Sequence, residues 1–328
     1  MARREDQKGR VLALYHLLYQ YTDDNHKLTM PKLLELLEHE GYPCDRRSVY
    51  SDLDALRHAG MEIEYTRGAN GGYWLLTRPF ELPELKLLAD AVQSARFLTT
   101  KKARLLLKKL SGLGSQYQAQ ELRGQIYTVG RARTENEQVY YNVDTIQQAI
   151  AEGRRIRFSY FSYNAKKEKV YKYGGAAYAA SPYGLCWDNE NYYLVAWYDR
   201  RGTIVNFRVD RMERIRLSEQ RAVPPPLRFR MDNYTQPLFG MFNGPLETVT
   251  LAFPERLATA MFDRFGWNVT PHADREPGCY RLTVKVELSP AFLGWIFQFG
   301  GQVRILSPEK AVQMLTQYAE AVLAPRSD

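Results

Sequence analysis

The chain has 328 residues, and its 45% hydrophobic and 25% charged residues are typical of a globular protein of two or three domains rather than a disordered one. No apolar run approaches the roughly 20 residues that cross a bilayer, and no apolar segment of a secretory signal follows the N-terminus. Cys44, Cys186 and Cys279 lie far apart, an odd set that favours reduced thiols. We therefore expect a cytoplasmic protein with no membrane partner.

The net charge of +8 suggests a polyanionic partner, and the distribution of charge locates the excess. Residues 1–78 hold 11 Lys and Arg against 12 Asp and Glu, so this segment is nearly neutral. The counts are 10 against 6 for residues 79–143, and 13 against 9 for residues 144–220. The basic excess therefore lies in the middle of the chain.

Three helical patterns and a hairpin pattern follow one another in residues 1–78. Residues 9–21 carry an apolar helical stripe, and residues 28–41 begin with Thr29 as a candidate N-cap. Residues 45–60 begin with Asp45 as a second candidate cap, and alternating apolar residues then flank the glycine-rich turn RGANGG. This order predicts a winged helix-turn-helix DNA-binding domain over residues 1–78.

The third helix of this domain would be the recognition helix, because its apolar side chains leave a polar face at its N-terminal half. The candidate contacts to duplex DNA on this helix and the wing are Arg46, Arg47, Ser48, Tyr50, Ser51 and Arg67. A small helical bundle with solvated arginines is the alternative, and composition alone does not separate the two.

Residues 79–143 are expected to form a helical linker or dimerisation element. Pro79 and Pro83 mark its start, and a long helical pattern continues into the lysine-rich TTKKARLLLKKL to give a helix pair. A basic helix lying on a membrane is the alternative, which the scarcity of aromatic residues disfavours.

Residues 144–222 read as a short helix followed by four or five strands, and the run PPP at 224–226 marks a domain edge. Residues 223–328 alternate strand and helix three times, a ferredoxin-like order that lacks one strand signal. The fold class expected for the whole chain is α+β and multidomain.

Motifs of catalysis and metal binding are missing from the sequence. It contains no G-x-S-x-G, H-E-x-x-H, G-x-x-x-x-G-K-[ST] or strand-linked G-x-G-x-x-G. Its five histidines and three cysteines show no metal-ligand spacing. We expect neither an enzyme nor a cofactor or metal site.

The stretch FRVDR places charges in an otherwise apolar strand. Alternation over residues 206–211 predicts that Arg208 and Asp210 share one face and that Arg211 lies on the other. Asp210 could pair with an arginine to hold the strands together, or Arg208 and Arg211 could bind an anion beside nearby tyrosines. Chemistry alone leaves both interpretations open.

The sequence SPYGLCWDNENYYLVAWYDRRGTIVNFRVDRMERI resembles the WYL-domain transcription regulators, with Tyr192-Tyr193-Leu194 at the position of the Trp-Tyr-Leu triplet. Residues 45–75 are similar to the DeoR-like winged helix that usually precedes this domain. FDRFG and SPAFLGWIFQFGGQVRILSPEKAV resemble the C-terminal extension of the same proteins. The resemblance spans nearly the whole chain.

The resemblance implies a mostly bacterial, homodimeric regulator in which an Sm-like small β-barrel over residues 144–222 senses a nucleic acid or nucleotide, single-stranded DNA in some members. It implies a ligand pocket on the strands around the triplet, formed by Tyr160, Ser181, Tyr183, Asn206, Arg208 and Arg211, with Tyr193 either lining it or in the core. Of the two arginines, we expect Arg208 to face the ligand.

Two other functions are compatible with the sequence. A nucleotide-acting enzyme would have Asp210 as its nearest candidate base, without an evident acid–base partner. An architectural single-strand binder would use the basic middle of the chain to follow a nucleic-acid backbone.

Overall fold

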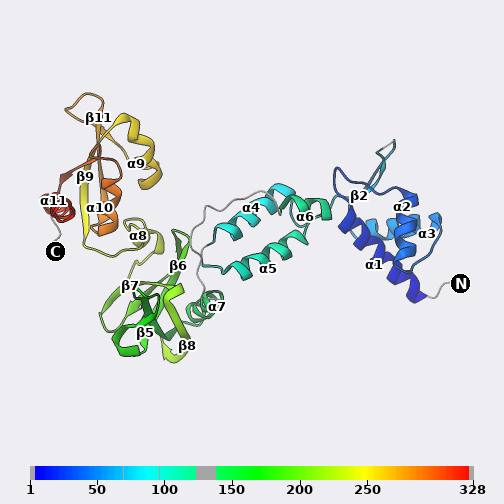
Figure 1. The fold of residues 1–328 in the computed structure, drawn as a ribbon, viewed down its shortest axis with the longest axis horizontal. Coiled ribbons are helices and arrows are strands. Elements are labelled where there is room, and N and C mark those ends of the chain that lie inside the picture. The colour runs from blue at the N-terminus through cyan, green and yellow to red at the C-terminus, as the bar shows by residue number, and fades with distance from the viewer. Residues whose placement is uncertain (1–3, 69, 96, 123–137, 325–328) are drawn as a thin grey trace. The chain divides into compact units, whose positions relative to one another are not determined.

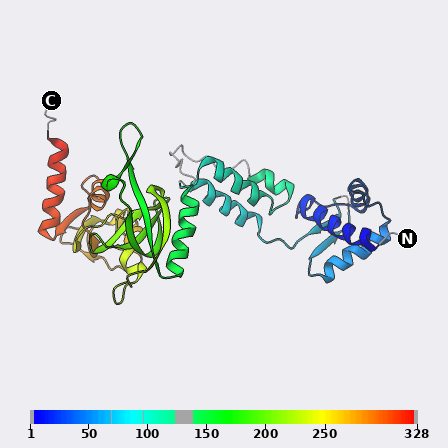
Figure 2. The same ribbon diagram turned by 90° about the horizontal axis from the view of Figure 1, so that it is seen from below.

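A computed structural model describes residues 4–68, 70–95, 97–122 and 138–324 of the chain. The chain folds as two units, Met1–Glu137 and Gln138–Asp328 (Figures 1 and 2). Ala69 of the predicted turn and residues 123–137 of the predicted linker lie outside the described residues. Residues 138–143, which the sequence places in the linker, belong to a helix of the second unit.

The first unit begins with the three predicted helices and the predicted hairpin (Figure 1). Thr29 and Asp45 are the N-caps, and each accepts a hydrogen bond from the backbone N–H three residues later. Leu28 pairs with Tyr73 and so holds the chain between the first two helices against the hairpin. The elements are α1 (Arg4–Tyr21), α2 (Met30–His39), α3 (Arg46–His58), β1 (Ile63–Thr66) and β2 (Gly72–Leu75).

One buried core and one ion pair hold these elements together. Leu14, Leu33, Leu53 and Leu75 come from four different elements and are at most 1% exposed. Arg10 of α1 binds the carboxylate of Asp52 on α3 with two nitrogens, at 2.6 and 3.2 Å. Because this pair lies inside the unit, it fixes α3 against α1.

The segment after the hairpin forms α4 (Leu82–Ser94), α5 (Thr100–Ser111) and α6 (Gln116–Leu122). The first two of these form the predicted helix pair, and α6 is a third helix beyond it. The apolar periodicity continues across the break, but Thr99 caps a new helix by accepting from the Lys102 backbone N–H at 3.2 Å.

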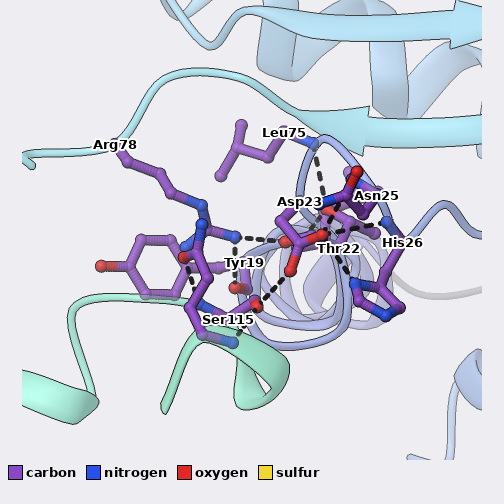
Figure 3. Close-up of polar contacts among 10 residues, drawn as sticks. Tyr19, Thr22, Asp23, Asn25, His26, Leu75, Arg78 and Ser115 are labelled. Carbon is purple, nitrogen blue, oxygen red and sulfur yellow. Dashed lines mark hydrogen bonds and ion pairs between the residues drawn. The ribbon is translucent and has the colours of Figure 1, made fainter. Parts of the chain in front are cut away.

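A polar network joins α6 to the end of α1, as Figure 3 shows. Ser115 donates to Asp23 at 2.5 Å, and Asp23 also accepts from the backbone of His26 at 2.9 Å. Arg78 donates to the carbonyl oxygens of Tyr19 and Thr22 at 2.8 and 2.5 Å. Within the first unit, these contacts attach α6 and the segment after β2 to the end of α1.

The second unit begins with α7 (Gln138–Ala151), which lies alongside a strongly curled antiparallel sheet (Figure 2). The strand order is β4-β3-β5-β6-β7, and β8 also pairs with β3. The described residues show no pairing between β7 and β8, so the sheet is a half-barrel rather than a closed barrel. Its elements are β3 (Arg154–Tyr163), β4 (Lys169–Tyr171), η1 (Lys172–Gly175), β5 (Tyr178–Asp188), β6 (Asn191–Tyr198), β7 (Thr203–Arg208), η2 (Val209–Arg211) and β8 (Met212–Arg221).

The predicted alternation over residues 206–211 holds in burial as far as Asp210, with Phe207 and Val209 buried, but fails at Arg211. The strand β7 ends at Arg208, and Val209–Arg211 form the single 3₁₀ turn η2 that leads into β8. Val209 is fully buried, so it holds this turn against the half-barrel. Arg208 and Arg211 therefore do not occupy opposite faces of one strand.

The C-terminal part of the second unit has four antiparallel strands in the order β10-β11-β9-β12. The two-residue β10 supplies the strand for which the sequence carries no signal. The assignment as ferredoxin-like stays a prediction. After α8 (Met231–Thr235) come β9 (Leu246–Pro254), η3 (Glu255–Leu257), α9 (Ala258–Phe265), β10 (His272–Ala273), β11 (Cys279–Glu287), α10 (Pro290–Phe297), β12 (Arg304–Ser307) and α11 (Glu309–Leu323).

Candidate functional site

The N-terminal half of α3 presents the predicted DNA-contacting residues to solvent. Val49, Asp52 and Leu53 are buried, so the opposite side of the helix is exposed. Arg46, Arg47 and Ser51 lie on that exposed side, while Ser48 is half-buried. Neither arginine makes an ion pair with another described residue, which leaves both guanidinium groups available for a phosphate or a guanine edge.

Tyr50, predicted to contact DNA, also makes a contact within the protein. Its side chain is 49% exposed, and it is hydrogen-bonded to Tyr73 of β2. Burial, and next the neighbouring Tyr50, raise the pKa of Tyr73 to about 12. This contact connects α3 to the hairpin and so fixes the two parts of the predicted DNA interface relative to each other.

The turn between β1 and β2 carries Arg67 at an exposed position. The turn depends on Gly71, because a Cβ atom there would lie 2.5 Å from the carbonyl oxygen of Thr66. Glycine at this position therefore lets the hairpin close and carry Arg67 at its tip.

The residues of the predicted ligand pocket do not gather in one place. Ser181 is fully buried and accepts a hydrogen bond from the Val223 backbone N–H at 2.9 Å. The hydroxyl of Tyr183 donates to the carbonyl oxygen of Pro224 at 3.2 Å. Tyr193 is buried in a cluster with Leu238 and Met241. All three side chains thus fasten the segment after β8 to the half-barrel.

Asn206 is also engaged by that segment. Its amide donates to the Met241 carbonyl at 3.0 Å and to Asn243 Oδ1 at 3.1 Å. Its own Oδ1 accepts from the hydroxyl of Tyr234 at 3.1 Å. These contacts join residues more than 25 positions apart in the chain, and no local pattern in the sequence indicates them.

Arg208 is bound within the protein. Its Nε and Nη2 donate to the two carboxylate oxygens of Asp210 at 3.0 and 2.8 Å, and Nη2 also donates to Asn191 Oδ1 at 2.9 Å. Burial lowers the pKa of the guanidinium, but the hydrogen bonds and charge of Asp210 outweigh it and leave the pKa raised. The arrangement matches the alternative in which Asp210 pairs with an arginine.

Arg211 makes no hydrogen bond or ion pair with any other residue that the structure describes. It lies near the hydroxyl of Tyr160, whose pKa is raised by burial against the opposing charges of Arg211 and Arg208. The Tyr160 hydroxyl accepts from the backbone N–H of Arg208 at 3.3 Å. Of the two arginines, Arg211 has the guanidinium that is free to bind an anion.

Two of the predicted pocket residues, Tyr160 and Asn206, line a cavity of about 420 Å³ on the half-barrel. Its walls are aromatic, with the ring of Tyr178 stacked on that of Tyr198 at 5.1 Å. We call this the aromatic cavity. Its lining residues are Tyr160, Lys172, Tyr173, Tyr178, Tyr198, Arg201, Val205, Asn206 and Phe207.

Two cations, Lys172 and Arg201, lie at the aromatic cavity, and Arg200 packs over the ring of Tyr173 at 3.8 Å. Burial, followed by the neighbouring tyrosine hydroxyls, raises the pKa of Tyr178 to about 12, so this hydroxyl is a neutral donor at pH 7. A cavity of aromatic rings and cations can stack a planar base and bind its phosphate. Strand alternation could have found Tyr178 and Phe207, whereas both cations lie outside the strands.

The described ranges contain no group of three His, Cys, Asp or Glu side chains that could hold a metal ion. In the same ranges, every helix is too short or too polar to cross a membrane.

Comparison with protein families identifies two domains. Residues 141–217 match the WYL domain and residues 245–323 match the WCX domain. The first range contains α7 and the half-barrel, and the second contains the four-stranded sheet with its helices. The chain thus carries a WYL domain followed by a WCX domain.

Solved structures with a detectable likeness include proteasome accessory factor B/C (PafBC) of Arthrobacter aurescens, at 19% identity and a TM-score of 0.27. That alignment covers 99% of this chain, which spans 48% of the length of the other. A CRISPR Cas-related protein is 15% identical with a TM-score of 0.36, over 96% of this chain and 84% of that one. No curated protein sequence matches the chain.

Proposed function

We propose that the chain is a DNA-binding transcription regulator that acts as a homodimer in the cytoplasm. Its N-terminal winged helix-turn-helix binds duplex DNA through α3 and the β1–β2 turn. Its WYL half-barrel binds a nucleic-acid or nucleotide effector, such as single-stranded DNA. The WYL and WCX matches support the regulatory assignment.

The observation that carries the proposal is the exposed end of α3. Two arginines without ion-pair partners stand at the N-terminal half of a helix whose other side is buried. The N-terminal half of a recognition helix is the part that contacts base edges in the major groove. Arg67 at the tip of the hairpin supplies a third cation on the same unit.

The proposal is tested with Arg47→Ala in the full chain and duplex DNA from the protein's own promoter region. A side chain that reads a guanine contributes about 1–3 kcal/mol, so affinity should fall between roughly fivefold and 150-fold. Lys32→Ala is the matched control, because it removes one exposed helix cation that is already paired with Glu35 at 2.6 Å. Equal affinities of wild type and Arg47→Ala for the duplex would show that α3 does not contact DNA through this arginine.

The aromatic cavity supports the effector part of the proposal. Its stacked tyrosines suit a base, and Lys172 and Arg201 suit a phosphate. The double change Lys172→Gln and Arg201→Gln should weaken binding of a mononucleotide at least tenfold, as measured by quenching of protein fluorescence. Unchanged binding would place the effector elsewhere.

Regulation requires that the effector bind one DNA-binding state of the protein more tightly than another. Saturating effector should therefore change the affinity for duplex DNA, and duplex should change the affinity for effector by the same factor. Independence of the two affinities would make the half-barrel a binding site without a regulatory role.

Exposed apolar side chains on the helices after the hairpin support self-association. Leu87 of α4 is 70% exposed and Leu105 of α5 is 50% exposed. Light scattering should give a mass of twice the 38.1 kDa of one chain. A monomeric mass at micromolar concentration would rule out the homodimer.

The nucleotide-acting enzyme and the architectural binder have less support. Arg208 occupies both carboxylate oxygens of Asp210, which disfavours this residue as a general base. Single-strand binding without any effect on duplex affinity would favour the architectural binder.

A further inference from the structure

A second concave surface lies on the half-barrel between β3 and β8, outside the aromatic cavity. It encloses about 580 Å³, which is within the roughly 300–1,000 Å³ of small-molecule sites. We call it the arginine groove. Its lining residues are Arg157, Phe158, Ser159, Ala177, Arg214, Arg216, Leu217, Ser218, Glu219 and Gln220.

Two of its arginines face each other across the sheet. Arg157 of β3 and Arg216 of β8 are direct antiparallel partners, and both are exposed. Side chains at directly opposite positions lie about 5 Å apart at Cβ, and like charges there repel. The pair alone does not stabilise the sheet, because its two charges repel each other. An anion bound between the two guanidinium groups would turn this repulsion into a net attraction.

A bulge in β8 brings a third arginine to the same groove. Between the pairs Arg157–Arg216 and Ser159–Glu213, two residues of β8 oppose the single residue Phe158 of β3. Arg214 lies in this bulge with φ of +54°, in the left-handed region that side-chain-bearing residues rarely adopt. The strained backbone thus directs a cation toward the groove.

Few acidic side chains offset the charge of these arginines, and the one near Arg214, Glu213, also has other cationic and hydroxyl partners. Glu213 is engaged by Lys169 and by the hydroxyl of Tyr171. Glu219 is the one carboxylate among the groove's lining residues, against three guanidinium groups. Within the described part of the chain, Arg157, Arg214 and Arg216 form no ion pair, so the groove keeps an excess of positive charge.

We propose that the arginine groove binds phosphodiester groups of a single-stranded nucleic acid. Guanidinium groups bind phosphate through paired N–H donors, and Ser159, Ser218 and Gln220 add neutral hydrogen-bonding groups. Ala177 lines the groove and the next residue, Tyr178, lines the aromatic cavity. A strand whose base stacks in the cavity therefore has a cationic groove next to it for its neighbouring phosphates.

This inference rests on the proposed effector class and adds a site that the aromatic cavity does not contain. A mononucleotide would fill the cavity alone, but a strand would use both. The two sites can consequently be tested apart, because groove variants should affect a strand and leave a mononucleotide unaffected.

The test uses the full chain, a fluorescein-labelled 15-residue oligothymidylate, and anisotropy titrations across a series of NaCl concentrations. The variant Arg157→Gln/Arg216→Gln is compared with Arg228→Gln/Arg275→Gln, which removes the same charge from exposed positions outside the groove. Each lost phosphate contact on a single strand should reduce the salt slope of log K by about 0.7. We expect the groove variant to lose about 1.4 in slope and the control to match wild type.

Thermal unfolding of wild type and variant in the absence of nucleic acid shows whether the groove variant is folded. Removing the like-charge pair should leave the melting temperature equal or higher, so weaker binding by the variant cannot be ascribed to misfolding. An unchanged slope in the groove variant, or binding of inorganic phosphate alone without oligonucleotide, would overturn the inference. If mononucleotide binding at the aromatic cavity persists, the proposed effector site stands independently.

Discussion

Replacing Asp52 by alanine should destabilise the first unit by removing the partner of a buried charge. The Arg10 side chain is 12% exposed and the Asp52 side chain 1%, and the hydrogen bond to Asp52 raises the pKa of Arg10 against the effect of burial. Arginine therefore stays charged when the carboxylate is removed. Breaking a buried pair in this way costs about 3–5 kcal/mol.

Hydrogen exchange measured by mass spectrometry tests this locally, on peptides from α1 and α3. A cost of about 3–5 kcal/mol corresponds to a loss of protection between roughly 100-fold and several thousand-fold. The double variant Arg10→Met/Asp52→Leu replaces both charges by apolar groups and should recover most of the protection, because neither charge remains buried. Protection that is unchanged in Asp52→Ala, or lower in the double variant than in the single one, would refute the reasoning.

Three further predictions concern other contacts. Burial raises the pKa of Asp23, but hydrogen bonds from Ser115 and His26 outweigh it and leave the pKa below the ordinary 3.8. The ionised Asp23 therefore stabilises the contact between α1 and α6 above about pH 4, and this stabilisation is lost as the pH falls through the lowered pKa. The variant Ser115→Ala should shift that loss to higher pH, as measured by hydrogen exchange during acid unfolding. Arg208→Ala should lower the melting temperature of the second unit by several degrees, since Asp210 loses a bidentate partner at a half-buried site; an unchanged melting temperature would contradict this. Gly71→Ala should weaken duplex binding, because the hairpin must open to admit the new Cβ; equal affinity would exclude the turn from the interface.

The sequence predicts the three helices and the hairpin of residues 1–78 well because their signals are local. The caps Thr29 and Asp45 act on backbone groups three residues away, and Gly71 acts within one turn. Apolar periodicity does not report where a helix stops, so it did not locate the break between α4 and α5. The side chain of Thr99 was the available signal for that break.

The candidate ligand site was harder to predict because its contacts are long-range. Ser181, Tyr183 and Asn206 are used by the segment after β8, at separations of 28 to 42 residues. Alternation also fails at a strand end, where η2 turns Arg211 away from the strand pattern. The cations of the aromatic cavity lie in connections, whose positions alternation does not constrain.

The central claim is that α3 reads duplex DNA, and selection from a random-sequence duplex pool tests it most directly. Wild-type protein should enrich a defined sequence, and Arg46→Ala/Arg47→Ala should enrich none or one altered at the guanines that these arginines contact. Enrichment of the same sequence to the same extent by both proteins would contradict the account.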